Sequence, residues 1–430
     1  MALASATAQA GGFALREQSA AGQGASFAGI AAGGALSSMF WNPATITQFS
    51  GKTFEAGVTG IFPSAAHSYS ASTLAGAPVI GALYRGDLGN SGDQAIVPNV
   101  YGSWQLSPDL WLGLSVNAPF GLGVSFPTTW AGAAYAQQSS IRTYNTSPTI
   151  AYKFNDWLSV AAGVQVQYMQ VQYGQLVGAF PATTAQIGGA GFGYGFTLGA
   201  TITPTPTTQI GIGYRSAINQ KINGNMTLPG AVPGTPGSVN TTLNLPDMIT
   251  VGLRQGIGDR FTLLAGFEWS GWSRIGTANL LQPNGAPALI GAGAVRFPFN
   301  YSDGFFYSLG GEYKVDPQLT LRAGIAFEKS PITDAVRTPR LPDNDRMWYS
   351  VGASYKPAAF QGLTFDLGYS FIDVKNTPIN ISAASGNPWF SPALGTYIGS
   401  VSSNIHILSV AMRYQWDADP APRRTHLVTK

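Results

Sequence analysis

The second half of the chain alternates, position by position, between large apolar residues and small or polar residues. The stretch 319–328 is typical, because its large register reads Leu319, Leu321, Ala323, Ile325 and Phe327. The same alternation recurs over 346–356, 363–371 and 408–416, and in each run every charged residue falls in the small, polar register. A period of two is the signature of β-strands with two different faces. We therefore predict long strands here.

The character of the small register indicates which surroundings these strands face. In a soluble sandwich the register opposite the core carries many charges, whereas here it is rich in Gly and lightly charged. Only 10% of all residues are charged, against about 25% in ordinary soluble proteins. The 45% apolar content argues against disorder, and charges or Pro and Gly clusters interrupt the apolar runs before a helix could span a bilayer. The pattern favours a transmembrane β-barrel with lipid outside and water inside.

The connections predict the topology of this barrel. We expect fourteen strands, near 52–62, 95–106, 109–126, 139–154, 157–173, 188–203, 206–224, 239–255, 260–273, 296–315, 318–329, 345–356, 363–375 and 401–416. Six short connections carry turn residues such as Ser107-Pro108-Asp109 and Gly258-Asp259, and they alternate with seven long ones. Short turns on one side and long loops on the other are typical of bacterial outer-membrane barrels. An even number of strands leaves both ends of the chain on the short-turn, periplasmic side.

The region before the barrel does not alternate. Ala8-Gln9-Ala10 has the form that signal peptidase reads, so we interpret 1–10 as a signal-peptide remnant and expect the mature chain to start near Gly11. The alternative is an unstructured, Ala-rich start. Residues 11–51 contain few bulky side chains and cannot form a core of their own. We predict that they plug the barrel, 52–416, and that 417–430 forms a polar C-terminal tail.

Several blocks resemble one family of proteins. The block Gly12-Phe13-Ala14-Leu15-Arg16-Glu17-Gln18-Ser19-Ala20-Ala21-Gly22, followed by Ala28-Gly29 and Trp41-Asn42-Pro43-Ala44, resembles the N-terminal hatch of FadL-type outer-membrane transporters. Further blocks in the same order are Asn117-Ala118-Pro119-Phe120-Gly121-Leu122, Glu268-Trp269-Ser270-Gly271-Trp272-Ser273 and Pro339-Arg340-Leu341-Pro342-Asp343. The family includes channels for long-chain fatty acids and for monoaromatic hydrocarbons.

The resemblance implies a fourteen-stranded antiparallel barrel, in the bacterial outer membrane, with a hatch inside its lumen. A hydrophobic ligand would enter from outside, bind in an apolar pocket and leave sideways through an opening in the wall. Such a route keeps the ligand out of water throughout. The sequence shows no energy source, so we expect a passive channel.

The resemblance also implies a gate and an opening. Asn42, Pro43 and Ala44 match the family motif expected against an inward kink of the third strand, although an ordinary turn is the alternative. Pro119, Phe120 and Gly121 fall at that kink. Pro removes a ladder donor and Gly weakens a strand, so an early strand end is the alternative.

The ligand-binding candidates are Phe13, Leu15 and Phe27, because the predicted hatch has few other bulky apolar residues. Packing between plug and wall is the alternative for all three. Arg215, Arg254 and Arg322 lie in the inward register and could meet a carboxylate head. The competing interpretation is a network in which these cations pair with inward carboxylates, namely Glu268, Glu312, Glu328 and Asp366.

Other classes of function find little support in the sequence. A net charge of +3 does not suggest a nucleic-acid surface, and the three His residues have no metal-ligand spacing. We predict no enzyme activity and no cofactor or metal. The expected partners are a hydrophobic small molecule, outer-membrane lipid and lipopolysaccharide, and the chain is expected to be a monomer. A structural or adhesive barrel, or an aromatic-hydrocarbon channel of the same family, is the alternative function.

Overall fold

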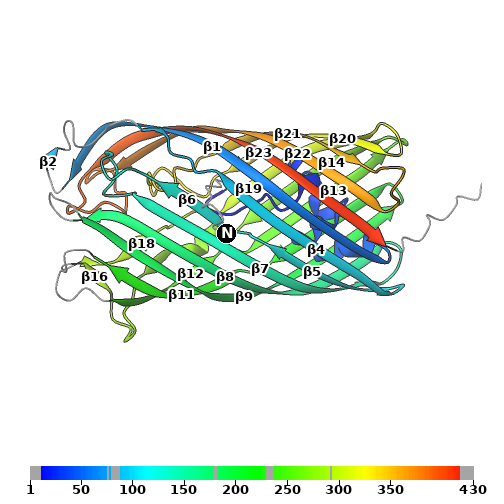
Figure 1. Ribbon diagram of the computed structural model, residues 1–430, viewed down its shortest axis with the longest axis horizontal. Helices are drawn as coiled ribbons and strands as arrows, with labels where there is room; N and C mark the ends of the chain where they lie inside the picture. Colours follow the sequence, from blue (N-terminus) through cyan, green and yellow to red (C-terminus); the bar gives the residue numbers. More distant parts are fainter. Residues whose placement is uncertain are drawn as a thin grey trace, which may run out of the picture.

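The computed structural model describes residues 11–74, 77–78, 88–177, 183–228, 237–290 and 293–416. The predicted leader (1–10) and tail (417–430) therefore lie outside the described residues. Seventeen strands build the wall (Figure 1), and they are β1 (Lys52–Leu74), β4 (Ala95–Ser107), β5 (Leu110–Asn117), β6 (Gly121–Ser125), β7 (Gln138–Lys153), β8 (Leu158–Val177), β9 (Thr183–Thr205), β10 (Thr208–Arg215), β11 (Ile218–Thr227), β12 (Ser238–Leu245), β13 (Met248–Ile257), β14 (Phe261–Ser270), β19 (Gly304–Lys314), β20 (Leu319–Lys329), β21 (Arg346–Tyr355), β22 (Leu363–Ile381) and β23 (Tyr397–Trp416).

These segments form fourteen antiparallel wall strands, because three pairs of segments each occupy one position. The divided strands are the third (β5 and β6), the seventh (β10 and β11) and the eighth (β12 and β13). β1 pairs with β4 on one side and with the last strand, β23, on the other. The wall therefore closes on itself, and the predicted closed barrel of fourteen strands is confirmed.

The remaining short elements lie in the long connections and in the luminal segment. The loops contain β2 (Ala77–Pro78), β3 (Leu88–Asn90), β15 (Thr277–Asn279), β16 (Leu289–Ile290), β17 (Gly293–Ala294), β18 (Arg296–Pro298) and the turn of helix η4 (Trp272–Ile275). The labels of β2, β16 and β18 mark the long-loop end, on the left of Figure 1. Among the described residues, no helix is both long and apolar enough to cross a membrane.

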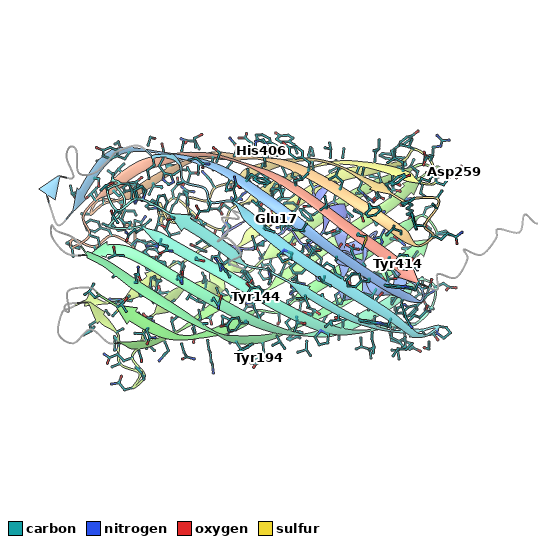
Figure 2. The ribbon with its side chains drawn as sticks, viewed as in Figure 1. Glu17, Tyr144, Tyr194, Asp259, His406 and Tyr414 are labelled. Atoms are coloured by element: carbon teal, nitrogen blue, oxygen red, sulfur yellow. The ribbon has the colours of Figure 1, made fainter. Side chains whose placement is uncertain are left out.

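The two faces of the strands divide as the alternation predicted. Leu321, Leu367 and Val410 are 45%, 47% and 45% exposed on the outer face. Their neighbours Asp366 and Arg413 are buried inside, at 2% and 9%. Figure 2 shows outward-facing tyrosines such as Tyr144 and Tyr194, whereas Glu17 lies within the lumen. The exposed apolar face is the lipid-facing surface of the wall.

Some predicted strand limits were wrong. The stretch 296–315 was expected to be one strand, but 296–298 forms β18, which pairs with β15 in a loop, and the wall strand begins at Gly304. The breaks in the seventh and eighth strands, at 216–217 and 246–247, were not predicted. Alternation of apolar and polar residues identifies an extended chain, but it does not identify the strand with which that chain pairs. These strand limits and breaks could therefore not be predicted from it.

Residues 11–51 fill the lumen at the short-turn end, on the right of Figure 1. They form four short helices, α1 (Ala20–Gln23), η1 (Ile30–Ala32), η2 (Leu36–Phe40) and η3 (Pro43–Gln48). We call these residues the luminal segment. Nearly all of its side chains are buried, although the segment has few large ones.

Inward-facing glycines of the wall allow this segment to approach closely. A Cβ added to Gly211 would lie 1.8 Å from the Ala31 carbonyl oxygen, and one on Gly324 would lie 2.2 Å from that of Ala25. We call the set the glycine belt, and its members are Gly211, Gly213, Gly252, Gly266, Gly310, Gly324, Gly352 and Gly368. Each contacts the luminal segment, mostly backbone against backbone. The belt therefore seats the segment without room for side chains between them.

Candidate functional site

Two cavities lie in the lumen on the long-loop side of the luminal segment. The inner cavity is lined by the luminal segment, the kink of the third strand, and strands from β8 to β20. The outer cavity lies between the outer ends of β8, β9 and β12 and the loops above them. Its aromatic and aliphatic lining includes Leu122, Tyr173, Phe297, Phe299 and Trp389.

Three aromatic rings lie between the two cavities. Phe13 stands edge-on to Trp272 with ring centroids 4.8 Å apart, and Phe120 lies 5.9 Å from Phe13 and 6.1 Å from Trp272. Phe13 lines the outer cavity, whereas Phe120 and Trp272 line the inner one. We call these three rings the aromatic partition. The partition thus joins the lining of the inner cavity to that of the outer cavity.

The third strand leaves the wall at the predicted position. β5 ends at Asn117 and β6 begins at Gly121. Between them the chain turns inward and pairs with the luminal segment, since the Leu15 amide donates to the Pro119 carbonyl at 2.8 Å and the Gly121 amide to the Phe13 carbonyl at 2.9 Å. Phe13 to Leu15 thus pairs with the kink through one β-bridge, between Ala14 and Phe120, and we call these three residues the strand 13–15.

This excursion interrupts the ladder between the second and third wall strands. β4 pairs with β5 up to Val100 and Val116. Among the described residues, β6 pairs with β7 but not with β4, and the next link on that side is a single bridge between Gly92 and Val124. The ladder therefore lacks its bonds along the intervening residues of β4, and the kink lies beside this gap.

The motif Asn42-Pro43-Ala44 lies elsewhere than predicted. Asn42 caps η3 by accepting the Ala44 amide at 3.0 Å, and its side-chain amide donates to the carbonyls of Ala31 (2.7 Å) and Ala200 (2.8 Å). Ala200 belongs to β9, so the motif packs on β9 and not on the third-strand kink. Gly199 permits this approach, since a Cβ there would lie 2.0 Å from the Asn42 oxygen. An Asn cap followed by Pro is a favoured helix start.

The three hydrophobic candidates for ligand binding, Phe13, Leu15 and Phe27, lie in three different places in the structure. Leu15 lines the inner cavity and Phe13 the outer one. Phe27 lines neither, because its ring packs against Trp41 (5.4 Å) and Trp348 (6.0 Å). The structure thus places Phe27 in the contact between luminal segment and wall, which was the alternative interpretation. An unusual backbone, with a φ of 58°, turns the ring toward the wall.

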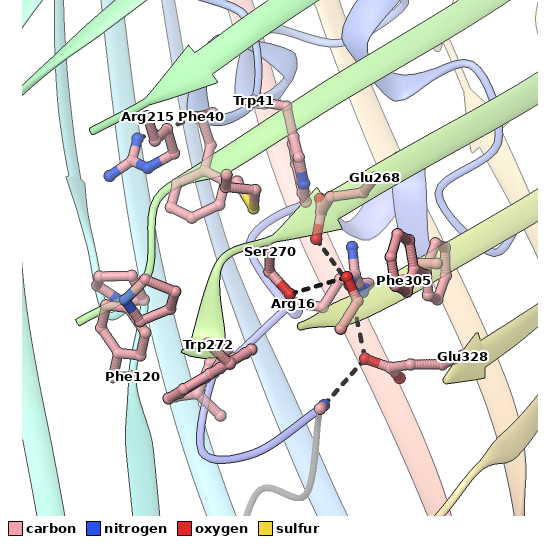
Figure 3. Close-up of a pocket in the computed structure, with 18 of the residues that line it drawn as sticks. Arg16, Phe40, Trp41, Phe120, Arg215, Glu268, Ser270, Trp272, Phe305 and Glu328 are labelled. Carbon is pink, nitrogen blue, oxygen red and sulfur yellow. Dashed lines mark hydrogen bonds and ion pairs between the residues drawn. The ribbon is translucent and has the colours of Figure 1, made fainter. Parts of the chain in front are cut away.

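The three inward-facing arginines also differ in their surroundings. Arg254 and Arg322 both bind Glu312, at 2.5 and 2.6 Å, and Arg322 lies 3.5 Å from Asp366. These two therefore belong to the ion-pair network that was the competing interpretation. Arg215 differs, because no carboxylate of the described residues lies within ion-pair distance of it. It lines the inner cavity, donates to the Phe40 carbonyl at 3.0 Å and to Gln165, and lies over the Phe40 ring (Figure 3).

The inner cavity contains further residues that sequence reasoning did not select. Arg16 binds Glu268 at 2.8 Å, and both line the cavity with Phe40, Trp41 and Trp272 (Figure 3). Glu268 was expected as an inward carboxylate, and Arg16 and Trp272 stood in blocks that carried the family resemblance, but none of the three was predicted to line the ligand site. The meeting of Glu268 with Arg16 depends on a contact across 252 residues of sequence, and no local pattern encodes such a distance.

Comparison with known proteins identifies the family. A model of the outer membrane transport proteins, described as OMPP1/FadL/TodX, matches residues 1–416. The chain belongs to this family. The long-chain fatty acid transport protein of Salmonella typhi is 27% identical over 417 residues, which is 88% of this chain and 91% of the relative.

Solved structures of family members agree with the fold. A FadL homologue from Pseudomonas aeruginosa superposes with a TM-score of 0.82 at 25% identity, covering 94% of this chain and 99% of that one. The Pseudomonas putida toluene transporter TodX gives a TM-score of 0.68 at 16% identity, with coverage of 94% and 99%. Membership of this family places the protein in the bacterial outer membrane.

Proposed function

We propose that this protein is a passive channel that carries hydrophobic molecules with a carboxylate head, such as long-chain fatty acids, across the outer membrane. The two internal cavities provide the apolar volume, and the relatives described as long-chain fatty acid transport proteins support the choice of ligand. Burial of each CH₂ group stabilises such a ligand by about 0.8 kcal/mol. An alkyl chain is therefore held firmly by an apolar pocket without any covalent step.

Arg215 is the reason for proposing a ligand with a carboxylate instead of a neutral ligand. A buried guanidinium without a carboxylate partner is costly unless something else neutralises it. Its two hydrogen bonds go to a neutral carbonyl and a neutral amide. A fatty acid in the inner cavity would bring its carboxylate to this cation while its chain contacts Leu15, Phe120 and Trp272. This guanidinium would thus select for the head group.

The proposed exit is the gap beside the third-strand kink. Pro119, Phe120 and Gly121 form the inner border of the gap, and Phe13 to Leu15 pairs with them. In this proposal the strand 13–15 is the moving part, and the aromatic partition opens when it shifts. Asn42, Pro43 and Ala44 anchor the luminal segment on β9 while this happens. Their predicted role as the gate itself stays a prediction.

A matched pair of ligands tests the role of Arg215. We expect Arg215→Met to weaken oleate binding about ten- to hundredfold, since a hydrogen bond to a charged group contributes about 1.5–3 kcal/mol and each 1.4 kcal/mol is about tenfold. Oleyl alcohol, which has the same chain and no carboxylate, should bind both proteins alike. Binding is measured by fluorescence displacement in detergent.

Uptake into liposomes then separates the candidate functions. Entry of oleate but not of sugars supports the proposal. Equal binding of oleate to Arg215→Met and the unaltered protein, combined with rapid toluene entry, would favour an aromatic-hydrocarbon channel, which the aromatic lining of the outer cavity also suits. No entry of either ligand would leave the structural or adhesive role as the better interpretation.

A further inference from the structure

The first two residues after the predicted cleavage point both bind carboxylates. The Gly11 nitrogen donates to Glu328 Oε1 at 2.9 Å, and the Gly12 nitrogen donates to Asp343 Oδ2 at 2.9 Å. Gly11 is buried and lines the inner cavity together with Glu328. A Cβ on Gly11 would lie 2.9 Å from Glu328 Oε1, so little space remains around this nitrogen.

These carboxylates belong to a buried cluster with an excess of negative charge. Arg16 lies 2.8 Å from Glu268 and 3.6 Å from Glu328, while Arg346 lies 3.7 Å from Glu328 and also pairs with Asp343. Three carboxylates and two guanidinium groups give 2 − 3 = −1. The five side chains are at most 10% exposed, and an unbalanced charge at such a site is expensive.

Neighbouring groups do not form a further ion pair with these carboxylates. Arg215 lines the same cavity and interacts electrostatically with Glu268, but no carboxylate of the described residues lies within ion-pair distance of it. Glu17 also lies close to Arg16 and Arg346, but it is neutral or negative, because burial raises the pKa of its carboxyl to about 7. Lys329 follows Glu328 in sequence and borders the inner cavity, but it is exposed and makes no ion pair with these carboxylates.

Cleavage of the chain after Ala10 would place a positive charge next to Glu328. Hydrolysis consumes one water: the C–N bond between Ala10 and Gly11 breaks, the hydroxyl joins the Ala10 carbonyl carbon, and the proton goes to the Gly11 nitrogen. That nitrogen then takes up a second proton from solvent at neutral pH and becomes an α-ammonium. We propose that removal of the leader after Ala10 creates a buried α-ammonium on Gly11, which ion-pairs with Glu328.

The ammonium would be a positioning group for the partition. It stands two residues before Phe13, and the Phe13 carbonyl accepts the Gly121 amide at the kink. With the ammonium in place, three N–H donors replace one amide donor. The pair therefore tethers the strand 13–15 at its free end. This inference depends on processing and on the cluster, and it holds for any ligand.

Two measurements on the full-length protein test it. Intact mass and N-terminal sequencing of protein purified from outer membranes should give a chain that begins at Gly11. The α-amine is then labelled with 2-pyridinecarboxaldehyde, which reacts with free N-terminal amines and spares lysine. We expect the folded protein to react slowly and Glu328→Gln to react about tenfold faster, because one charge-assisted bond of about 1.4 kcal/mol is lost.

Two further variants serve as controls for the labelling experiment. Glu312→Gln removes a luminal carboxylate that binds Arg254 and Arg322, and it should leave the labelling rate unchanged. If Glu328→Gln does not fold, an alanine inserted between Ala10 and Gly11 moves the new amine away from Glu328 and should give the same fast labelling. A mature chain that starts at another residue, or an α-amine that is labelled equally fast in the unaltered protein and in both variants, would overturn the proposal.

Discussion

Individual side chains of the luminal segment differ in what they contribute. Phe27 packs on Trp41 and Trp348, whereas Phe13 stands in the partition between the cavities. We expect Phe27→Ala to lower the free energy of unfolding by about 3–5 kcal/mol and to leave oleate affinity within twofold. Phe13→Ala should instead accelerate exchange of a fluorescent fatty acid between the cavity and solution. Faster ligand exchange in Phe27→Ala than in Phe13→Ala would contradict this division.

Glu17 makes stability depend on pH. Burial raises the pKa of its carboxyl from 4.5 to about 7, and one of its oxygens, Oε2, has no hydrogen-bond partner among the described residues. In the unfolded chain this carboxyl ionises near pH 4.5, while the folded protein keeps the proton until about pH 7. The stability that the neutral form provides is therefore full below about pH 4.5 and declines as pH rises to about 7.

The neutral analogue tests this dependence. Glu17→Gln should remove the decline and stabilise the protein at pH 8 by about 1–3 kcal/mol, since each pKa unit is about 1.4 kcal/mol. The temperature at which the folded band disappears in a heat-modifiable gel, compared at pH 5 and pH 8, measures the effect. Glu312→Gln is the control of opposite sign, because it breaks two ion pairs and should destabilise the barrel.

At the scale of an element, the kink of the third strand is the feature with the clearest consequence. A Cβ on Gly121 would lie 2.8 Å from a methyl of Leu15, so Gly121→Leu should displace the strand 13–15. We expect strongly reduced fatty acid uptake with unchanged equilibrium binding in detergent. Gly174→Leu, on β8, is a suitable control, because a Cβ there meets nothing closer than 3.5 Å. Normal uptake by a folded Gly121→Leu protein would favour a path through the luminal segment to the periplasm.

The three broken strands show what a sequence can predict. Pro119 and the glycines after it marked the third-strand break, because both residue types weaken a ladder locally. Ser216-Ala217 carries no such cue. The ladder with β9 resumes only at Asn223 and Ala190, and before that point the Gln220 side chain donates to the Gly191 carbonyl at 2.7 Å. The position of Asn42-Pro43-Ala44 was missed for the same reason. Which wall strand receives a luminal side chain is decided by contacts far apart in the sequence.

At the scale of the whole molecule, the two faces of the wall respond oppositely to charge. We expect Leu367→Arg to cost about 2–4 kcal/mol, as for Arg on the lipid face near mid-bilayer. Asp366→Asn, one residue away, should cost less, because its side chain stays in the polar lumen. Urea-induced unfolding in lipid vesicles measures both.

Cysteine labelling checks the same assignment independently. The chain contains no Cys, so Leu367→Cys and Asp366→Cys each carry a unique thiol. A lipid-soluble maleimide should label position 367 and spare position 366, and equal labelling of the two would refute the inward and outward assignment.

The glycine belt has a consequence for how the protein is made. Its close contacts run from Gly211 on β10 to Gly368 on β22, and the luminal segment fits them without free space. A finished wall of hydrogen-bonded strands cannot widen to admit such an object afterwards. We therefore expect the luminal segment to be in place before β1 and β23 join, so that the sheet closes around it. Supplied as a separate peptide to a barrel that has already closed, 11–51 should fail to enter it.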